Sequence, residues 1–256
     1  MPSSTVITWV PRQHGAWAML IAPGVTGLIV GGFSWRGPVT LVAWLVAFGA
    51  YASLGQMLKV PPARRARWWP PLVVYGTAAV VLAGVVVVSA PALLRWAPCF
   101  VVLFGTSLVC QLRRAERSWL NDLVTQLAAG LMTVIVAGLP PVGSPPSGWL
   151  PPGADNATAW RAAGMVFAYF FGTVFYVKTM LRERGRASTY AASLAYHALI
   201  AAAGWWLGPL AGAVGLVLLA RAALVPRAWP RAQAKTIGLG EFAATVVVVA
   251  ATVLTV

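Results

Sequence analysis

Residues 71–90 read PLVVYGTAAVVLAGVVVVSA, twenty consecutive positions without a charge. As an α-helix, an apolar segment of this length matches the thickness of the hydrocarbon core of a membrane. The sequence contains nine such apolar runs, of which 71–90 is the third. They span roughly residues 16–34, 38–57, 71–90, 93–111, 120–140, 160–180, 188–206, 208–225 and 237–256. The pattern predicts an all-α polytopic membrane bundle of about nine transmembrane helices.

The composition agrees with a membrane location. The chain has 256 residues, of which 59% are hydrophobic and 9% charged, and this excludes an ordinary soluble domain. A net charge of +14 would suggest nucleic acid as the partner of a soluble protein. Here the basic residues lie in short loops between apolar runs, so membrane orientation explains them better. We therefore expect membrane lipids and no nucleic acid as partners.

The basic residues also predict an orientation. Sixteen of the nineteen Lys and Arg residues precede the first run or follow the second, fourth, sixth and eighth runs. The other gaps hold only Arg36, Arg95 and Arg161. The positive-inside rule then predicts a multi-pass protein of the bacterial plasma membrane, with the N-terminus in the cytoplasm and the C-terminus outside. The loop at 140–159, PPVGSPPSGWLPPGADNATA, is expected on the extracytoplasmic side, with six prolines that exclude regular helix.

A short motif hints at an internal repeat. Phe-Gly followed by Met-Leu and a basic residue occurs at 48–59 and again at 171–182, an offset of 123 residues. Both copies end a predicted helix on the same side of the membrane. The repeated motif predicts two related four-helix units within a single transmembrane domain, at 12–115 and 116–235, followed by a final helix at 237–256.

Three scarce ionisable residues are candidates for acid–base chemistry, because such groups at membrane depth are costly. Asp122 opens the fifth run, where it either complements the helix dipole or belongs to a polar stripe that enters the membrane. His197, within the seventh run, suits a helix–helix hydrogen bond as well as a catalytic role. Glu241 opens the ninth run as a first-turn carboxylate, as a partner for a loop arginine, or as a general acid.

A second set of residues is predicted to bind substrate from the same side. Lys178 and Arg182 share a helix face at the end of the sixth run, where they either snorkel to lipid phosphates or clamp an anionic headgroup. The full predicted binding set is His14, Asn121, Lys178, Arg182 and Lys235. No nucleotide motif or cluster of metal ligands occurs in the sequence, so no metal is predicted and a cofactor is left unassigned.

Several of these residues carry a family resemblance. The opening PRQHGAWAML at 11–20 is the most specific stretch. It is accompanied by Glu116-Arg117, Leu120-Asn121-Asp122, Val177-Lys178, Met180-Leu181-Arg182, Tyr196-His197, Lys235, Ile237-Gly238 and Glu241. Together they resemble the YwiC-like family of bacterial integral membrane proteins over nearly the whole chain. That resemblance implies a membrane location but no particular reaction.

A more distant resemblance is architectural. Nine spans with a cytoplasmic N-terminus and polar groups at the cytoplasmic ends are similar to UbiA-type prenyltransferases. Those enzymes hold an isoprenyl diphosphate through magnesium on Asp-rich motifs near the ends of their second and sixth helices. At these places this chain has Gln56-Met57-Leu58-Lys59 and Lys178 to Arg184, without paired aspartates. The resemblance thus implies an isoprenoid-like ligand held by basic residues, not metal-dependent prenyl transfer.

Three functions follow as hypotheses. The first is a binder of, or enzyme for, an isoprenoid, quinone or lipid amphiphile, with a polar and basic pocket on the cytoplasmic side. The second is a proton-coupled small-molecule transporter that uses Glu241 and His197 along a path through the membrane. The third is an assembly or accessory subunit of a membrane complex. Convergence of the candidate residues on one cavity open to the cytoplasmic leaflet would favour the first hypothesis, whereas a cavity that reaches both faces would favour the second.

Overall fold

The computed structural model describes residue 9 and residues 14–139 and 148–256, without the side chains of His14 and Gly15. Across these residues it contains nine α-helices and no strand, which confirms the all-α prediction. The helices are α1 (His14–Gly31), α2 (Arg36–Lys59), α3 (Trp69–Ser89), α4 (Ala97–Leu112), α5 (Trp119–Ala137), α6 (Ala157–Val177), α7 (Ala187–Leu207), α8 (Pro209–Ala228) and α9 (Ala234–Thr255). Two short 3-10 segments, η1 (Pro62–Trp68) and η2 (Pro91–Trp96), precede α3 and α4, and a π-helical turn, η3 (Lys178–Arg182), ends α6.

Seven segments are long and apolar enough to cross a membrane: α2, α3 with η1, α4 with η2, α5, α6 with η3, α8 and α9. The described apolar part of α1, Ala16–Gly31, is shorter than these segments. In α7, Ser, Thr, Tyr and His side chains occupy much of the first half. The chain is therefore a multi-pass helical membrane protein in which seven of the nine described helices have the composition of a full span.

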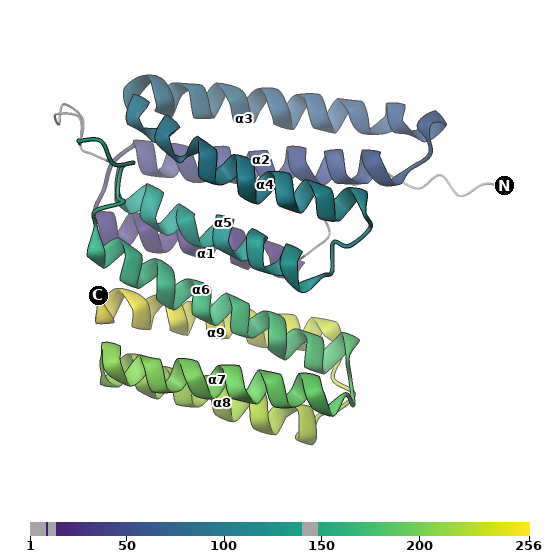
Figure 1. Cartoon of the computed structure of the whole chain (residues 1–256), viewed down its shortest axis with the longest axis vertical. Helices are drawn as coiled ribbons and strands as arrows, with labels where there is room; N and C mark the ends of the chain where they lie inside the picture. The colour runs from purple at the N-terminus through teal and green to yellow at the C-terminus, as the bar shows by residue number, and fades with distance from the viewer. Residues whose placement is uncertain (1–8, 10–13, 140–147) are drawn as a thin grey trace.

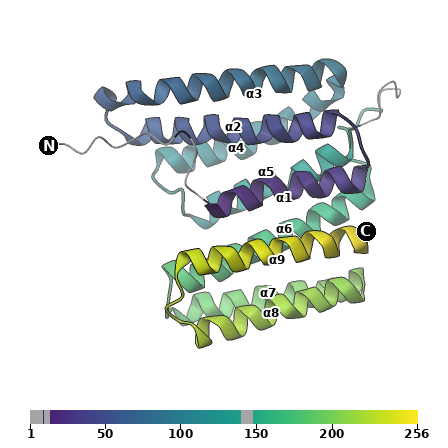
Figure 2. The same ribbon diagram turned by 180° about the vertical axis from the view of Figure 1, so that it is seen from behind.

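Successive helices run in opposite directions, and they form two layers (Figures 1 and 2). One layer contains α2, α1, α9 and α8, the other contains α4, α5, α6 and α7, and α3 lies at the edge beside α2. The connections α2–α3, α4–α5, α6–α7 and α8–α9 all lie at one end of the bundle, and the C-terminus lies at the other. We call the first of these the basic end, because most of the described arginines and lysines between helices lie there.

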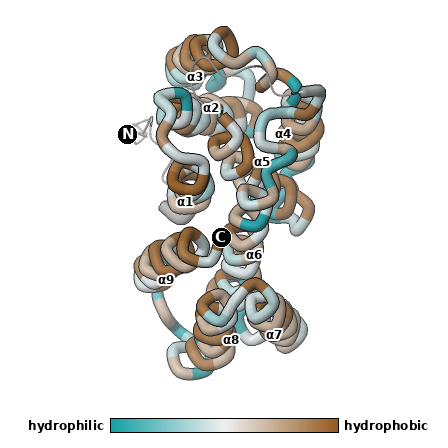
Figure 3. Tube along the Cα trace, turned by 90° about the vertical axis from the view of Figure 1, so that its left-hand side faces the viewer, coloured by the Kyte–Doolittle hydropathy of each residue, from teal (hydrophilic) through white to brown (hydrophobic). Residues whose placement is uncertain are grey.

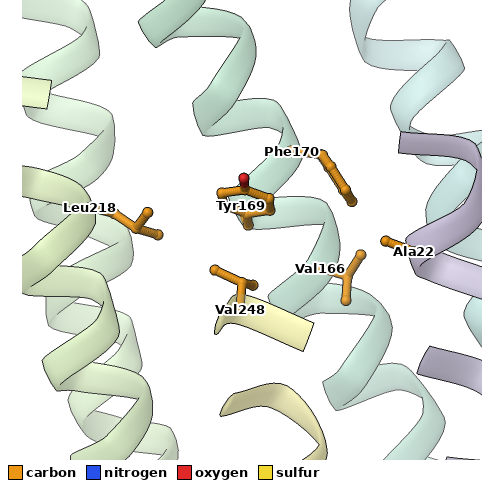
Figure 4. Close-up of a cluster of buried hydrophobic side chains, with 6 residues drawn as sticks. All are labelled: Ala22, Val166, Tyr169, Phe170, Leu218 and Val248. Atoms are coloured by element: carbon orange, nitrogen blue, oxygen red, sulfur yellow. The ribbon is translucent and has the colours of Figure 1, made fainter. Parts of the chain in front are cut away.

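The centre of the bundle is α6. A buried cluster joins it to α1, α8 and α9 through Ala22, Val166, Tyr169, Phe170, Leu218 and Val248 (Figure 4). Helix α1 also packs against α5, so the two predicted four-helix units share an interface, and their relation as repeats stays a prediction. Much of the outer helix α3 is coloured as hydrophobic in Figure 3. It exposes apolar side chains such as Val80 and Val88, as expected for a lipid-facing surface.

The proline-rich segment is shorter than predicted at its C-terminal side. Residues 140–147 lie outside the described part, but the following residues fold back onto the bundle, where Trp96 Nε1 donates to the Pro152 carbonyl at 3.0 Å. Helix α6 then begins at Ala157, because Asn156 caps it by accepting the Ala159 N–H at 2.9 Å. The predicted start near residue 160 was thus late by about one turn.

Candidate functional site

The first turn of α5 is held in a network of polar side chains. Ser118 caps the helix by accepting the backbone N–H of Asn121 at 3.2 Å. The Asn121 side chain accepts from the Ser107 hydroxyl of α4 at 2.6 Å and donates to the Glu116 carbonyl at 2.8 Å. Ser107 in turn lies 2.5 Å from the Tyr51 hydroxyl of α2. Asn121 therefore links three helices, which capping of α5 alone does not require.

Asp122, one residue later, forms an ion pair across to α6. Its Oδ2 lies 2.6 Å from Nζ of Lys178, and Lys178 is 4% exposed. The ammonium also lies 3.5 Å from the ring centroid of Trp119, a cation–π contact on the same turn of α5. The π-helical turn is closed by a bond from the Glu183 N–H to the Lys178 carbonyl at 2.8 Å. Lys178 is thus neutralised within the protein, whereas Arg182 at the end of the same turn is exposed.

Glu241 lies deeper than the first turn of α9 and holds three helices together. Its Oε1 accepts from Nη1 of Arg221 in α8 at 2.5 Å, and its Oε2 accepts from the Thr173 hydroxyl of α6 at 2.8 Å. The Tyr169 hydroxyl donates to the backbone carbonyl of Glu241 at 2.9 Å. Arg221 also stacks on Tyr176, with its guanidinium carbon 4.3 Å from the ring centroid. The expected arginine partner of Glu241 exists, but it lies within α8 and not in a loop.

A large cavity of about 2740 Å³ collects most of the predicted site residues. It is lined from α1, α2, α4, α5, α6 and α9 together with the loops at the basic end. The predicted residues that line it are Asn121, Asp122, Lys178, Arg182, Lys235 and Glu241. Six of the eight predicted residues thus line one cavity.

The cavity is polar at one end and apolar along the rest of its length. Its charged lining residues belong to the basic end or to the first two turns inward from it. Beyond them the lining is mostly apolar, with aliphatic residues such as Ile21 and Val249 and aromatic residues such as Trp44. It extends to Ile29 and Leu254, near the opposite ends of α1 and α9. Such a shape matches a molecule with a polar head and a long apolar tail.

Of the two histidines, the one whose side chain is described, His197, stands apart from this arrangement. His197 is 1% exposed, its Nδ1 lies 2.7 Å from the Ser193 carbonyl, and it does not line the cavity. Its other ring nitrogen faces Gly172 of α6, where a Cβ would lie 3.3 Å from it. These contacts fit the helix–helix role that the sequence left open. The side chain of His14 lies outside the described residues.

Two carboxylates in the connecting loops carry shifted pKa values. Lys59 lies 2.7 Å from Glu116, and its hydrogen bond holds the pKa of that carboxyl below the usual value. The Thr189 hydroxyl donates to Glu183 and likewise lowers the pKa of Glu183. Both groups are therefore anionic at neutral pH. Among the described residues, no three His, Cys, Asp or Glu side chains are grouped as metal ligands.

Comparison with known proteins identifies the family. The sequence model of the YwiC-like protein family matches residues 10–137. A protein of Bacillus subtilis (strain 168), named "Uncharacterized protein YwiC", is 30% identical over 221 residues, which is 86% of this chain and 84% of the relative. The chain belongs to the YwiC-like family.

A second relative is less similar in sequence but is matched over more of its length. This "Uncharacterized protein" of Haemophilus influenzae (strain ATCC 51907 / DSM 11121 / KW20 / Rd) is 25% identical over 242 residues, or 93% of this chain and 94% of the relative. No solved structure matches the chain. Neither relative's name states an activity.

Sequence reasoning missed several residues of the site. Arg221 was counted among the loop charges after the eighth run, although it lies in α8 and pairs with Glu241. Tyr169 and Thr173 were not singled out, because single hydroxyls in an apolar helix carry no distinctive pattern. For Arg221 a signal did exist: it interrupts the apolar run at 208–225, where a charge needs a partner.

Proposed function

We propose that this protein binds an amphiphile with an anionic headgroup, of the isoprenoid, quinone or lipid kind, in the cavity of the basic end. The observation that carries the proposal is that one continuous cavity has a charged end, while the rest of its lining is mostly apolar. A headgroup at the charged end would leave its tail between the apolar faces of α1 and α9. Burial of the tail would supply about 0.8 kcal/mol for each methylene removed from water.

The charge balance at the charged end favours an anion. Asp122 and Glu241 line the cavity, but each is already paired with a basic residue, Lys178 and Arg221 respectively. Arg182 and Lys235 line the same cavity and have no ion-pair partner among the described residues. The unpaired charge at this end of the cavity is therefore positive, and an anionic headgroup would neutralise it. This is the basic-residue recognition that the distant UbiA-type resemblance implied.

The candidates for acid–base chemistry in the helical part of the cavity are Asp122 of α5 and Glu241 of α9, which line it. The transport hypothesis has weaker support, because it needs Glu241 and His197 on a common path. His197 is packed against α6 outside the cavity lining, and the lining far from the basic end is mostly apolar. A proton-coupled path would need polar groups along that length.

The proposal includes an orientation. The basic end would face the cytoplasm, the C-terminus would lie outside, and all nine helices would be embedded in the plasma membrane of the bacterium. In this orientation the charged part of the cavity lies at the depth of the headgroups of the inner leaflet. Anionic lipids of that leaflet would then be within reach of Arg182 and Lys235.

Native mass spectrometry of the protein purified in mild detergent tests the proposal. We expect an amphiphile to co-purify with the wild-type protein and to be depleted in the Arg182→Ala variant. Arg64→Ala is the matched control, since Arg64 is an exposed arginine of the same end that does not line the cavity. Absence of any bound amphiphile from the wild type, or equal loss in both variants, would contradict the proposal.

A further inference from the structure

The end of α4 carries an arginine in a conformation that normally belongs to glycine. The backbone N–H of Arg114 bonds to the Gln111 carbonyl at 3.0 Å, and that of Ala115 bonds to the Cys110 carbonyl at 2.7 Å. These two bonds form a Schellman cap, whose left-handed position is usually occupied by glycine. Arg114 occupies it with φ of 55°, and it is the one non-glycine residue of the described chain with positive φ. A side chain there strains the backbone, so its retention needs a reason.

The side chain of Arg114 has no structural partner that would supply that reason. It lines the cavity of the basic end, and it makes no hydrogen bond or ion pair with the described residues. Its neighbour Arg113 differs in two respects, because it has an ordinary φ of −84° and does not line the cavity. The left-handed turn thus separates two adjacent arginines, one of which belongs to the cavity.

A buried amide one turn earlier points to the same place. Gln111 is 8% exposed and lines the cavity, and its Oε1 has no hydrogen-bond partner in the described structure. Gly55 of α2 leaves the space that this amide fills, because a Cβ at Gly55 would overlap Oε1. A buried acceptor without a protein partner is costly, and a donor from a ligand in the cavity would relieve that cost.

On the basis of the proposed function, we infer that Arg114 and Gln111 form a subsite for a phosphate-bearing headgroup with a hydroxyl or P–OH donor. The guanidinium of Arg114 donates to the anionic phosphate oxygens in the geometry that suits an arginine fork. The amide oxygen of Gln111 accepts from the hydroxyl. A carboxylate headgroup is less suitable, because it is fully ionised at neutral pH and brings no donor for Gln111.

The strained conformation gives the test a distinctive outcome. Arg114→Gly removes the guanidinium but suits the left-handed position, so the fold should keep its thermal midpoint or gain up to about 4 °C. Arg113→Gly is the control for loss of one charge from the same turn. A variant that is as stable as the wild type and binds more weakly separates a ligand contact from a structural role.

The measurement is the rise in unfolding temperature of the full-length protein in detergent with dioctanoyl phosphatidic acid, compared with dioctanoyl phosphatidylcholine and inorganic phosphate. We expect phosphatidic acid to stabilise the wild type. Its apparent Kd should rise about tenfold or more in Arg114→Gly and stay unchanged in Arg113→Gly.

Equal affinity in Arg114→Gly and wild type would overturn the subsite while leaving the proposed function intact. Stabilisation by phosphate alone that depends on Arg114 would support the subsite and contradict an amphiphile as its ligand. Failure of both the short-chain lipid and phosphate to bind the wild type would overturn the inference, and native mass spectrometry would then decide the proposed function separately.

Discussion

The ammonium of Lys178 lies 2.6 Å from Oδ2 of Asp122, and this ion pair joins the π-helical end of α6 to the first turn of α5. The side chains are 5% and 19% exposed, so both charges are largely removed from water. Removal of one partner would leave the other charge buried and uncompensated. The pair therefore couples the geometry of the cavity to the packing of two helices.

The first prediction is that this coupling is strongly non-additive. Lys178→Met or Asp122→Asn should each lower the free energy of unfolding by about 3–5 kcal/mol, because each leaves an unpaired charge in the interior. The double variant should lose clearly less than the sum of the two single losses. A double-mutant cycle on unfolding in detergent measures this, and additive losses would show that the two charges do not interact.

The second prediction concerns Glu116 at the mouth of the cavity. Its folded pKa is lowered by Lys59, so the stability from this pair is present above the unfolded pKa of about 4.5 and is lost as the pH falls through the lower folded value. Both side chains are partly exposed, at 36% for Lys59 and 28% for Glu116, which limits the effect to about 0.2–1 kcal/mol. Glu116→Gln should be less stable than wild type at about pH 7, and the two should converge once the pH falls below the lowered pKa of Glu116. A gap that stays constant over this range would assign the difference to something other than the titration of Glu116.

The third prediction tests the proposed orientation. Alkaline phosphatase is active only outside the cytoplasm, so a fusion after Val256 should be active. A fusion in the α6–α7 connection after Gly185 should be inactive, because that connection lies at the opposite, basic end (Figure 1). Immunoblots of both fusions control for expression. The reverse pattern of activity would place the basic end outside and would refute the orientation.

The fold was accessible from sequence because long apolar runs and their basic gaps obey the simple physics of membrane insertion. Runs such as 71–90 and 237–256 became helices with similar boundaries, α3 and α9. The apolar runs were a weaker guide to how many helices are long and apolar enough to cross a membrane on their own. The described part of α1 is short and α7 is comparatively polar, so seven helices meet that measure.

The site was only partly accessible, because its geometry depends on how the helices are rotated about their axes. Asp122 and Lys178 could be nominated from their depth in the membrane, but their mutual pairing arises from the packing of α5 on α6. Arg221 was grouped with loop residues, although α8 carries it into contact with Glu241. The same limit applies to His197, since its position on α7 did not reveal that it faces Gly172 and not the cavity.

Helix rotation also decides which of the glycines allow two helices to approach closely, and the fourth prediction follows from this. A Cβ at Gly27 of α1 would lie 2.7 Å from the backbone oxygen of Thr133 and 3.0 Å from Cβ of Val136, both in α5. Gly27→Ala should therefore force α1 away from α5 and cost about 1–3 kcal/mol of stability. Gly76 of α3 has open space at the same position, so Gly76→Ala should be neutral or should stabilise the helix by up to about 1 kcal/mol. Unfolding of both variants in one detergent makes the comparison. Because the chemical change is the same in both, equal effects would mean that α1 and α5 are not packed through Gly27.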